Sequence, residues 1–574
     1  MQPDDANKLS GANILMECLL EQGVDTVFGY PGGAIMPVYD ALYSYQDRIK
    51  HILTAHEQGA SHAADGYARH SGKVGVCFAT SGPGATNLVT GIATAHMDSS
   101  PVVFITANVN EALIGKDSFQ EVDIVGISMP ITKSNYLVRD VNNLADIVRE
   151  AFAVARGGRP GPVLIDIMRN VTLDTAEYTP LPREDHHTSG RLGALVQRAS
   201  HDFKAHEPNQ EDINQLAEMI KEAKKPLIIC GGGVVRGRAE KQFKEFAEKV
   251  DAPVAITVMG VGGFSNHNPL ATGMIGMHGT QASNRASDSC DLLIAVGCRF
   301  SDRVGLQFKT FAGNAKIVQI DIDRSEINKN VQTDHHIIGD AGEVLERLSK
   351  QLPQMQHDEW KREVFAWDTE VRYSNRTDAM TPEQVLSTIA RILPEETIVS
   401  TDVGQHQMWA IQHFKFSYPG QLITSGGFGA MGFGLGAAIG AKAANPDQVV
   451  LHVTGDGSFR MNGHEMSTEH HYNLPVITVV FNNGTLGMVR QWQSLLFDDR
   501  HSETTLDRGP DFVKLAEAYG LGGARASNVE EFEAALKAAL ESGTGYVIDC
   551  IIDSSEMVRP MVGAGAHVTD FLLE

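Results

Sequence analysis

Short apolar runs alternate with longer amphipathic segments along most of the chain, and glycine-rich turns follow several of the apolar runs. In the first third, VGVCFAT at 74–80 is followed by SGPGATN, a helical segment to about residue 97 and the run PVVFIT. The last third repeats this order with QVVLHVT, GDGS, a helical segment and PVITVVF, which is followed by NNG. Strands that alternate with helices in this way are typical of parallel sheets covered by helices on both faces.

The middle third has the same character, since KPLIICGGGV runs from a strand into glycines and KIVQIDIDRSEIN contains a later strand. Two segments interrupt the alternation: residues 171 to about 210 are rich in Pro, His and acidic residues, and 351–380 is polar without a sheet pattern. We interpret both as linkers. The sequence therefore predicts an α/β protein of three doubly wound domains with parallel sheets, near residues 1–180, 208–350 and 378–574. The first and third domains are expected to be variants of one unit.

The composition is that of a globular protein, with 574 residues, 42% of them hydrophobic and 21% charged. No run of about 18 uncharged apolar residues is present, so we expect no membrane span. A formal net charge of −23 argues against nucleic acid or an anionic membrane as a partner. The stretch MQPDDANKLSGAN is unlike a secretory signal, and the six cysteines include no CxxC pair. We therefore expect a reducing, cytoplasmic compartment.

The GDGS turn lies at the end of a buried strand, and the next strand ends in two asparagines. Its glycines allow a phosphate to approach the backbone, and the N–H groups of the following helix favour negative charge. Asp456 would repel a phosphate unless a cation lay between them, and Mg²⁺ prefers such hard oxygen ligands. A lone GDG would indicate only a turn, but the second oxygen-bearing strand end favours a metal–diphosphate site. The candidate metal ligands are Asp456, the side chain of Asn483 and the carbonyl of Thr485, and the candidate diphosphate contacts are Gly455, Gly457 and Ser458.

GDG followed by NN at this spacing resembles the cofactor motif of thiamine diphosphate (ThDP) enzymes. The resemblance implies a glutamate on the first domain of a neighbouring subunit, and TAHEQGASHAADGYAR places Glu57 at a predicted strand-to-helix turn. Taken alone, Glu57 would be a solvated carboxylate at a helix N-terminus. Within the family it is implied to hydrogen-bond the cofactor's pyrimidine ring and promote loss of the thiazolium C2 proton.

Seven further blocks lie between residue 28 and about residue 501, in all three domains. Together they resemble the catalytic subunit of acetohydroxyacid (acetolactate) synthases. The resemblance implies that two pyruvates give 2-acetolactate and CO₂, or that pyruvate and 2-ketobutyrate give 2-aceto-2-hydroxybutyrate, in branched-chain amino acid biosynthesis. It further implies ThDP, Mg²⁺ and FAD, a homodimer or dimer of dimers with sites between subunits, and a small regulatory subunit. The blocks are FGYPGGAIMPVYDAL, SGPGATNLVTGIATA, DSFQEVD, GMIGMHGT, STDVGQHQMWA, FGAMGFGLGAAIGA and LGMVRQWQ.

Site residues are carried over from the resemblance position by position. Trp492 is implied to favour 2-ketobutyrate by packing on its extra methyl, a contact of about 1–3 kcal/mol. Arg303 resembles the arginine that holds the acceptor carboxylate, a role that suits a planar guanidinium. From the residues alone, Trp492 would be a core residue and Arg303 part of a surface ion pair. The other positions are Gly33, Pro83, Asn87, Gln405, His406 and Met431 for ThDP, and Phe119, Gln120 and Met488 for the active-site lining.

The middle domain resembles the FAD-binding domain of the same enzymes. Three glycines, Gly231, Gly232 and Gly233, end a strand and are implied to cradle the FAD phosphates, although GGG by itself indicates only a loop. The flavin is implied to be structural, because the net reaction transfers no electrons. Four further residues match flavin-contacting positions, namely Arg159, His278, Arg299 and Asp321.

The chain departs from the family pattern at Asn108, Arg169, Ser301 and Gly436. Arg169 keeps a cation at the substrate channel but changes its shape. Two alternatives stay open: another ThDP enzyme of 2-keto acids, such as a pyruvate oxidase or decarboxylase, and a non-catalytic chain that keeps the fold.

A cluster of His and Glu residues follows the GDGS turn and could be mistaken for a zinc site. Its order, H-E-x-x-x-E-H-H, fits neither HExxH nor HxxEH. We expect a polar helix face instead. The cluster consists of His464, Glu465, Glu469, His470 and His471.

Overall fold

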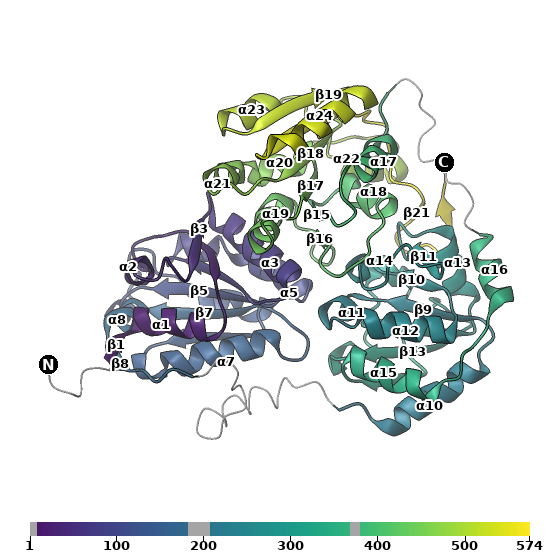
Figure 1. Ribbon diagram of the computed structural model, residues 1–574, viewed down its shortest axis with the longest axis horizontal. Helices are drawn as coiled ribbons and strands as arrows, with labels where there is room; N and C mark the ends of the chain where they lie inside the picture. The colour runs from purple at the N-terminus through teal and green to yellow at the C-terminus, as the bar shows by residue number, and fades with distance from the viewer. Residues whose placement is uncertain (1–7, 182–206, 368–378, 574) are drawn as a thin grey trace.

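The computed structural model describes residues 8–181, 207–367 and 379–573, and no helix within these ranges is long and apolar enough to cross a membrane. They form three bodies, each built on a six-stranded parallel sheet (Figure 1). The first body, purple to blue in Figure 1, and the teal central body lie side by side, and the green-to-yellow third body lies across both. The prediction of three α/β domains with parallel sheets is confirmed.

The first sheet is doubly wound. Helices α1 (Gly11–Glu21) and α7 (Leu144–Arg156) pack on one face, and α3 (Glu57–Ser71) and α5 (Val89–Met97) pack on the other. The strands are buried on both sides, which explains their near-continuous apolar sequences. In spatial order they are β3 (Lys50–Leu53), β2 (Thr26–Gly29), β4 (Gly75–Ala79), β5 (Val102–Asn108), β7 (Val163–Met168) and β6 (Ser134–Val138).

The third sheet repeats the topology of the first. When the strands of each sheet are numbered in chain order, both sheets have the order 2-1-3-4-6-5. The expectation that the two domains are variants of one unit is therefore confirmed at the level of topology. The strands are β16 (Leu422–Thr424), β15 (Ile398–Thr401), β17 (Val450–Gly455), β18 (Ile477–Asn482), β20 (Tyr546–Ile551) and β19 (Gly522–Ala526).

The central sheet has the strand order 3-2-1-4-5-6, which is the Rossmann order. In such sheets a ligand crevice opens at the carboxyl ends of the two strands where the order reverses, here β9 and β12. The strands are β11 (Ala271–Met274), β10 (Val254–Ile256), β9 (Pro226–Cys230), β12 (Leu292–Val296), β13 (Lys316–Asp321) and β14 (His335–Ile338).

Parts of the two expected linkers belong to the folded bodies. Strand β8 (Thr175–Glu177) pairs with β1 (Lys8–Ser10), and α16 (Asp358–Phe365) packs on the central domain. The Trp360 indole donates a hydrogen bond to the Pro226 carbonyl at 2.9 Å, so a polar helix is anchored by one aromatic side chain. The other linker residues fall partly outside the described ranges, and the exact domain boundaries stay a prediction.

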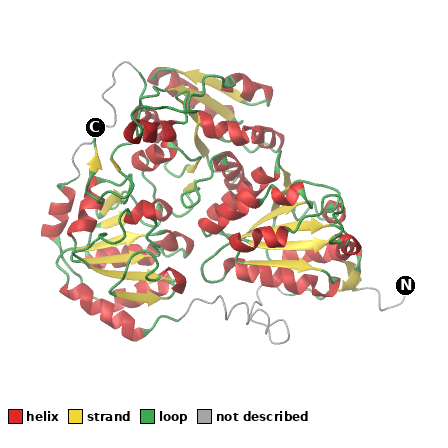
Figure 2. Ribbon diagram, turned by 180° about the vertical axis from the view of Figure 1, so that it is seen from behind, coloured by secondary structure: helices red, strands yellow, loops and turns green. Residues whose placement is uncertain are grey.

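The first and third domains meet through α3 and α19 (Phe433–Ala444), which lie together at the centre of the molecule in Figures 1 and 2. A Cβ on Gly66 would lie 2.1 Å from the Ala437 carbonyl oxygen, and one on Gly440 would lie 1.9 Å from that of Ala63. The two helices therefore touch backbone to backbone. Leu435 and Ile439 of α19 join the core of the first domain.

Replacing Gly66 with Val is expected to destabilise the chain, because the side chain must push α19 away from α3. Overpacking of this kind costs about 1–3 kcal/mol. Thermal unfolding of Gly66→Val would measure this cost. Gly33→Val is the control, since nothing lies within 4 Å of a Cβ on Gly33. Equal melting temperatures of the two variants would contradict the tight contact.

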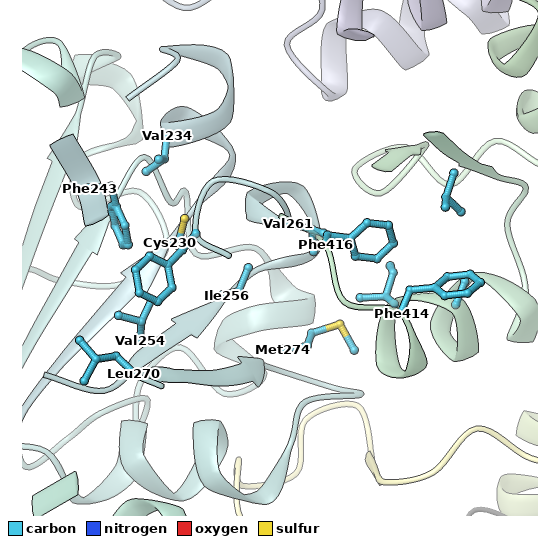
Figure 3. Close-up of a cluster of buried hydrophobic side chains, with 14 of the residues drawn as sticks. Cys230, Val234, Phe243, Val254, Ile256, Val261, Leu270, Met274, Phe414 and Phe416 are labelled. Atoms are coloured by element: carbon cyan, nitrogen blue, oxygen red, sulfur yellow. The ribbon is translucent and has the colours of Figure 1, made fainter. Parts of the chain in front are cut away.

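The central and third domains share one apolar core. Phe414 and Phe416 follow α18 (Gln405–His413) and lie beside Val261 and Met274 of the central domain (Figure 3). The Asn266 backbone N–H donates to the Phe416 carbonyl at 3.0 Å across the same boundary. This shared core fixes the position of the central crevice relative to the third domain.

Candidate active site

The two strand ends that carry the metal motif are neighbours in the third sheet. Gly455 of β17 pairs with Phe481 of β18, and α20 (Asp456–Asn462) begins directly after β17. Asp456 is only 2% exposed, and among the described residues its Oδ2 has no hydrogen-bond partner. A buried carboxylate oxygen without a partner is costly, and a cation beside it would offset that cost.

Asn483 connects this corner to the start of α18. Its Nδ2 donates to Gln405 Oε1 at 3.3 Å, and its Oδ1 accepts from the backbone N–H of Thr485 at 3.1 Å. The sheet edge thus gathers a carboxylate and an amide oxygen from two adjacent turns. These are the hard oxygen donors that suit Mg²⁺, so the residues present fit such an ion.

The electrostatics of this corner match a missing positive charge. Burial raises the pKa of Asp456 to about 7, although Arg460 and nearby backbone N–H groups act in the opposite direction. A cation beside Oδ2 would favour the ionised form. Burial also lowers the pKa of His406 to about 4, so the imidazole is neutral, and its Nε2 has no partner within the described ranges.

A buried group that the sequence analysis did not single out lies close to His406, whose imidazole bonds to the Asp402 backbone. Asp402 Oδ2 accepts from Thr454 Oγ1 at 2.7 Å and lies 3.2 Å from His452 Nε2, while Oδ1 accepts from the Gly434 N–H. Burial alone would raise the pKa of Asp402, but these partners hold it at about 2. Its place directly after β15 is the only sign of this role in the sequence.

Glu57 begins α3 at the carboxyl edge of the first sheet and is 9% exposed. Asn87 Nδ2 donates to its Oε2 at 2.9 Å, and a Cβ on Gly84 would lie 3.2 Å from Oε1. One carboxylate oxygen is thus held, and the other faces a space that glycine keeps free.

Loops that carry other sequence-predicted residues lie at the same edge of the first sheet. Pro83 begins α4 (Pro83–Thr86), the loop that contains Gly33 is held by a bond from the Ala34 N–H to Thr80 Oγ1, and Gln120 approaches Gly82. Phe119 is 88% exposed. Between described residues, no hydrogen bond or ion pair joins Glu57 to Asp456, Asn483 or Thr485.

A cavity of about 1220 Å³ opens at the reversal of the central sheet, and residues of all three domains line it. Met97 and Ser99 come from the first domain and Gly404 from the third. Its volume exceeds the range of ordinary small-ligand sites, about 300–1,000 Å³. The sequence-predicted residues that line it are Arg159, Gly232, Gly233, His278, Arg299, Arg303, Asp321, Met431, Met488 and Trp492.

The polar residues of this cavity are fixed by burial and bonding. Burial raises the pKa of Asp321, at the end of β13, to about 6, and lowers that of His278 to about 4. Arg159 donates to Ser99 Oγ at 2.9 Å and to Glu326 Oε1 at 2.7 Å, which joins the first and central domains.

The glycines that end β9 have a packing role. A Cβ on Gly231 would lie 2.2 Å from the Gly297 carbonyl oxygen, and one on Gly233 would lie 2.5 Å from Gly297 Cα. Gly232 and Gly233 line the cavity, whereas Gly231 is not among the described residues that do. Close contact between the turns after β9 and β12 explains why glycine is needed there.

Arg236 is a cavity residue that the sequence analysis missed. It ends α11 (Gly232–Arg236), one turn after Gly232, and its Nε donates to the Asp98 carbonyl at 3.3 Å. Burial and the neighbouring Arg69 lower its pKa to about 10. The helical spacing from the glycines could have indicated it.

Helix α22 (Gly487–Leu496) follows the metal motif and carries Met488 and Trp492 one turn apart, both of which line the cavity. Trp492 also packs against the cluster of Met277, Leu306, Met561, Val562 and Val568. Arg303 lines the cavity while its side chain, 3.3 Å from Asp302, stays largely exposed. Trp492 is therefore both a core residue and a cavity residue. Arg303 both pairs with Asp302 and lines the cavity.

The His and Glu cluster after GDGS differs from the expected solvated helix face. Glu465 and Glu469 are both buried. Within the described ranges no group of three or more His, Cys, Asp or Glu residues is arranged to hold a metal ion. The face is therefore only partly solvated: His470 and His471 are exposed, whereas Glu465 bonds to Ala55 and His56 of the first domain.

Comparison with known families matches each body to one thiamine pyrophosphate enzyme domain. The N-terminal TPP binding domain matches residues 9–127, the central domain matches 213–348 and the C-terminal TPP binding domain matches 402–550. The "Probable acetolactate synthase large subunit" of Methanocaldococcus jannaschii is 44% identical, covering 98% of this chain and 95% of its own length. The chain belongs to the family of acetolactate synthase large subunits.

Other members of the acetolactate synthase large subunits align over the same extent. The "Acetolactate synthase isozyme 2 large subunit" of Escherichia coli (strain K12) is 44% identical, over 98% of this chain and 99% of its own length. The "Acetolactate synthase large subunit" of Cyanidium caldarium is 42% identical, over 98% and 96%. Full-length alignment with this family favours it over the pyruvate oxidase and non-catalytic alternatives.

Proposed function

We propose that the chain is an acetohydroxyacid synthase that decarboxylates pyruvate and joins the remaining two-carbon unit to pyruvate or 2-ketobutyrate. The observation that carries this proposal is the group at the ends of β17 and β18, where the buried Asp456 Oδ2 has no partner among the described residues and where Asn483 bonds to Gln405. When bound there, ThDP supplies a nucleophilic carbon and an electron sink for decarboxylation.

The residues of the third domain bind the charged end of the cofactor. Asp456, Asn483 and the Thr485 carbonyl would hold Mg²⁺, whose charge would offset that of the diphosphate. Neutral His406 and Gln405 would contact the diphosphate beside the glycines of the GDG turn. The packing of α20 and α22 against the sheet excludes water from this corner, because Asp456 and Gln491 are buried.

Residues of the first domain would share a proton with the pyrimidine end of the cofactor. Asn87 occupies Glu57 Oε2, so Oε1 is left to share a proton with a ring nitrogen of the pyrimidine. From the family resemblance we expect a second copy to complete each site, as a homodimer or a dimer of dimers. The planar guanidinium of Arg303 would orient the carboxylate of the acceptor 2-keto acid.

FAD fits the central cavity on three grounds. The cavity has about 1220 Å³, its walls meet at the Rossmann reversal, and Asp321 at the end of β13 offers carboxylate oxygens to a hydroxyl group. Arg159 and Arg236 provide cations for its phosphates. The flavin would be structural, since the proposed reaction transfers no electrons.

The remaining partners follow from the family and the residues. The relatives are named large subunits, so we expect a small regulatory subunit. All six cysteines are free and buried, which supports a reducing compartment such as the cytoplasm.

Product analysis tests the proposed function. The purified chain would be incubated anaerobically with pyruvate, 2-ketobutyrate, ThDP, Mg²⁺ and FAD. The products would then be separated and identified by mass spectrometry. 2-Acetolactate and 2-aceto-2-hydroxybutyrate without flavin bleaching are expected. Bleaching coupled to acetate formation would favour a pyruvate oxidase, and failure to bind ThDP would favour a non-catalytic chain.

Replacing Trp492 with Leu is expected to lower the preference for 2-ketobutyrate over pyruvate, because the indole face that packs on the extra methyl is lost. The effect should be about 10-fold, within the 1–3 kcal/mol of one methylene contact. Competition between the two acceptors measures it as a product ratio. Leu496→Ala, one turn further along α22 and exposed, is the matched control. An unaltered ratio in Trp492→Leu would refute the assigned role.

A further inference from the structure

Glu465 of the third domain reaches into the turn of the first domain that carries Glu57. It ends the short helix η7 (Gly463–Glu465) and is 0% exposed. Its Oε2 accepts from the Ala55 backbone N–H and its Oε1 from that of His56, both at 3.1 Å. These two residues directly precede Glu57, so the carboxylate holds the backbone from which Glu57 starts.

Neighbouring residues leave room for the Glu465 carboxylate and donate hydrogen bonds to it. A Cβ on Gly59 would lie 1.9 Å from Oε1, so only glycine leaves room for the carboxylate at that position. Thr468 Oγ1 donates to Oε2 at 2.6 Å and fixes the side chain from its own domain. Burial raises the pKa of Glu465 to about 6, against the effect of these three donors, so the group is ionised at neutral pH. An ionised acceptor makes each of the three bonds stronger.

The position of the carboxylate also suits the helix that follows. It lies at the N-terminus of α3, where unsatisfied N–H groups and the helix dipole favour negative charge. His56 caps the same end, because its Nδ1 accepts from the Gln58 N–H at 3.0 Å. The backbone groups around Glu57 are therefore held on both sides, and the direction in which the Glu57 side chain leaves the helix is set.

We propose that Glu465 is a positioning residue for Glu57, an inference that rests on the proposed function of Glu57 as the proton-sharing acid. It touches neither substrate nor cofactor. It fixes the position of the strand-to-helix turn, so that the Glu57 carboxyl would lie close enough to the pyrimidine ring to share a proton. A displacement of about 1 Å at such a site can cost about 10²-fold in rate.

Glu465→Gln tests the inference, because one of the two accepting oxygens becomes an NH₂ donor that would face a backbone N–H. We expect turnover to fall about 10-fold or more, with the KM for pyruvate and the affinity for ThDP within about two-fold of the parent. Glu469→Gln is the matched control. It removes a second buried carboxylate of the same cluster, whose backbone bond, from the Val476 N–H at 3.0 Å, lies within the third domain. Its turnover should stay within about two-fold of the parent.

A double substitution separates positioning from general destabilisation. If Glu465 acts through Glu57, adding Glu465→Gln to Glu57→Gln should cost no further turnover. Losses that multiply would overturn the inference while leaving Glu57 in its role. Full turnover in Glu57→Gln alone would instead remove the proposed mechanism itself.

Gly59→Ala provides a second route if Glu465→Gln does not fold. The added methyl displaces the carboxylate without removing its charge. The same pattern of lowered turnover with retained ThDP affinity is expected. Unchanged turnover in Gly59→Ala would overturn the inference.

Discussion

Glu57→Gln is expected to lower the turnover of pyruvate by about 10²-fold or more, while the affinity for ThDP stays close to that of the parent. An amide keeps the size of the side chain and the contact with Asn87 but cannot share a proton with the pyrimidine ring. Steady-state turnover and ThDP titration by intrinsic fluorescence measure the two effects separately. Retained binding with lost turnover is the signature of a proton-sharing role.

Glu177→Gln is a suitable control for this experiment. It changes an exposed carboxylate of β8 and should leave both quantities unchanged. Turnover in Glu57→Gln within about two-fold of the parent would exclude Glu57 from the mechanism.

Asp456→Asn is expected to weaken Mg²⁺-dependent ThDP binding by about 10²-fold or more, since even outer contacts of a metal site contribute about 10–100-fold to affinity. The carboxylate balances the cation that the diphosphate requires, and an amide does not. Isothermal titration with ThDP at fixed Mg²⁺ measures the loss.

Without cofactor, the same substitution should not lower the thermal stability of the protein. Asp456 Oδ2 is buried and lacks a partner among the described residues, so its charge is a cost to the apo protein. Apo Asp456→Asn is therefore expected to melt at the same temperature as the parent or higher. Loss of stability in the apo variant, with unweakened ThDP binding, would contradict the metal assignment.

The sequence predicted the parts of the molecule whose determinants are local. Runs such as VVLHVT between a helical segment and a glycine turn indicate buried parallel strands, and they are found as β17 and its counterparts. Asp456 and Asn483 were predicted to be neighbours because the carboxyl ends of adjacent parallel strands share one edge, and β17 and β18 are adjacent.

The sequence did not predict features that depend on distant contacts. Glu465 has the helical spacing of a solvated face, and what buries it lies about 410 positions earlier, at Ala55 and His56. Helix α16 was interpreted as linker because its anchoring is done mainly by Trp360 on the central domain. Arg236 was missed because the glycine run alone does not reveal the cavity that three domains enclose.

If FAD binds in the shared cavity, as proposed, the lifetime of the chain would depend on a vitamin supply. Its walls separate when the protein unfolds, so a molecule bound there at 100 times its dissociation constant adds about 2.7 kcal/mol to the free energy of unfolding. With FAD as that molecule, cells short of riboflavin would lose this chain to proteolysis, even though its chemistry consumes no reducing equivalents.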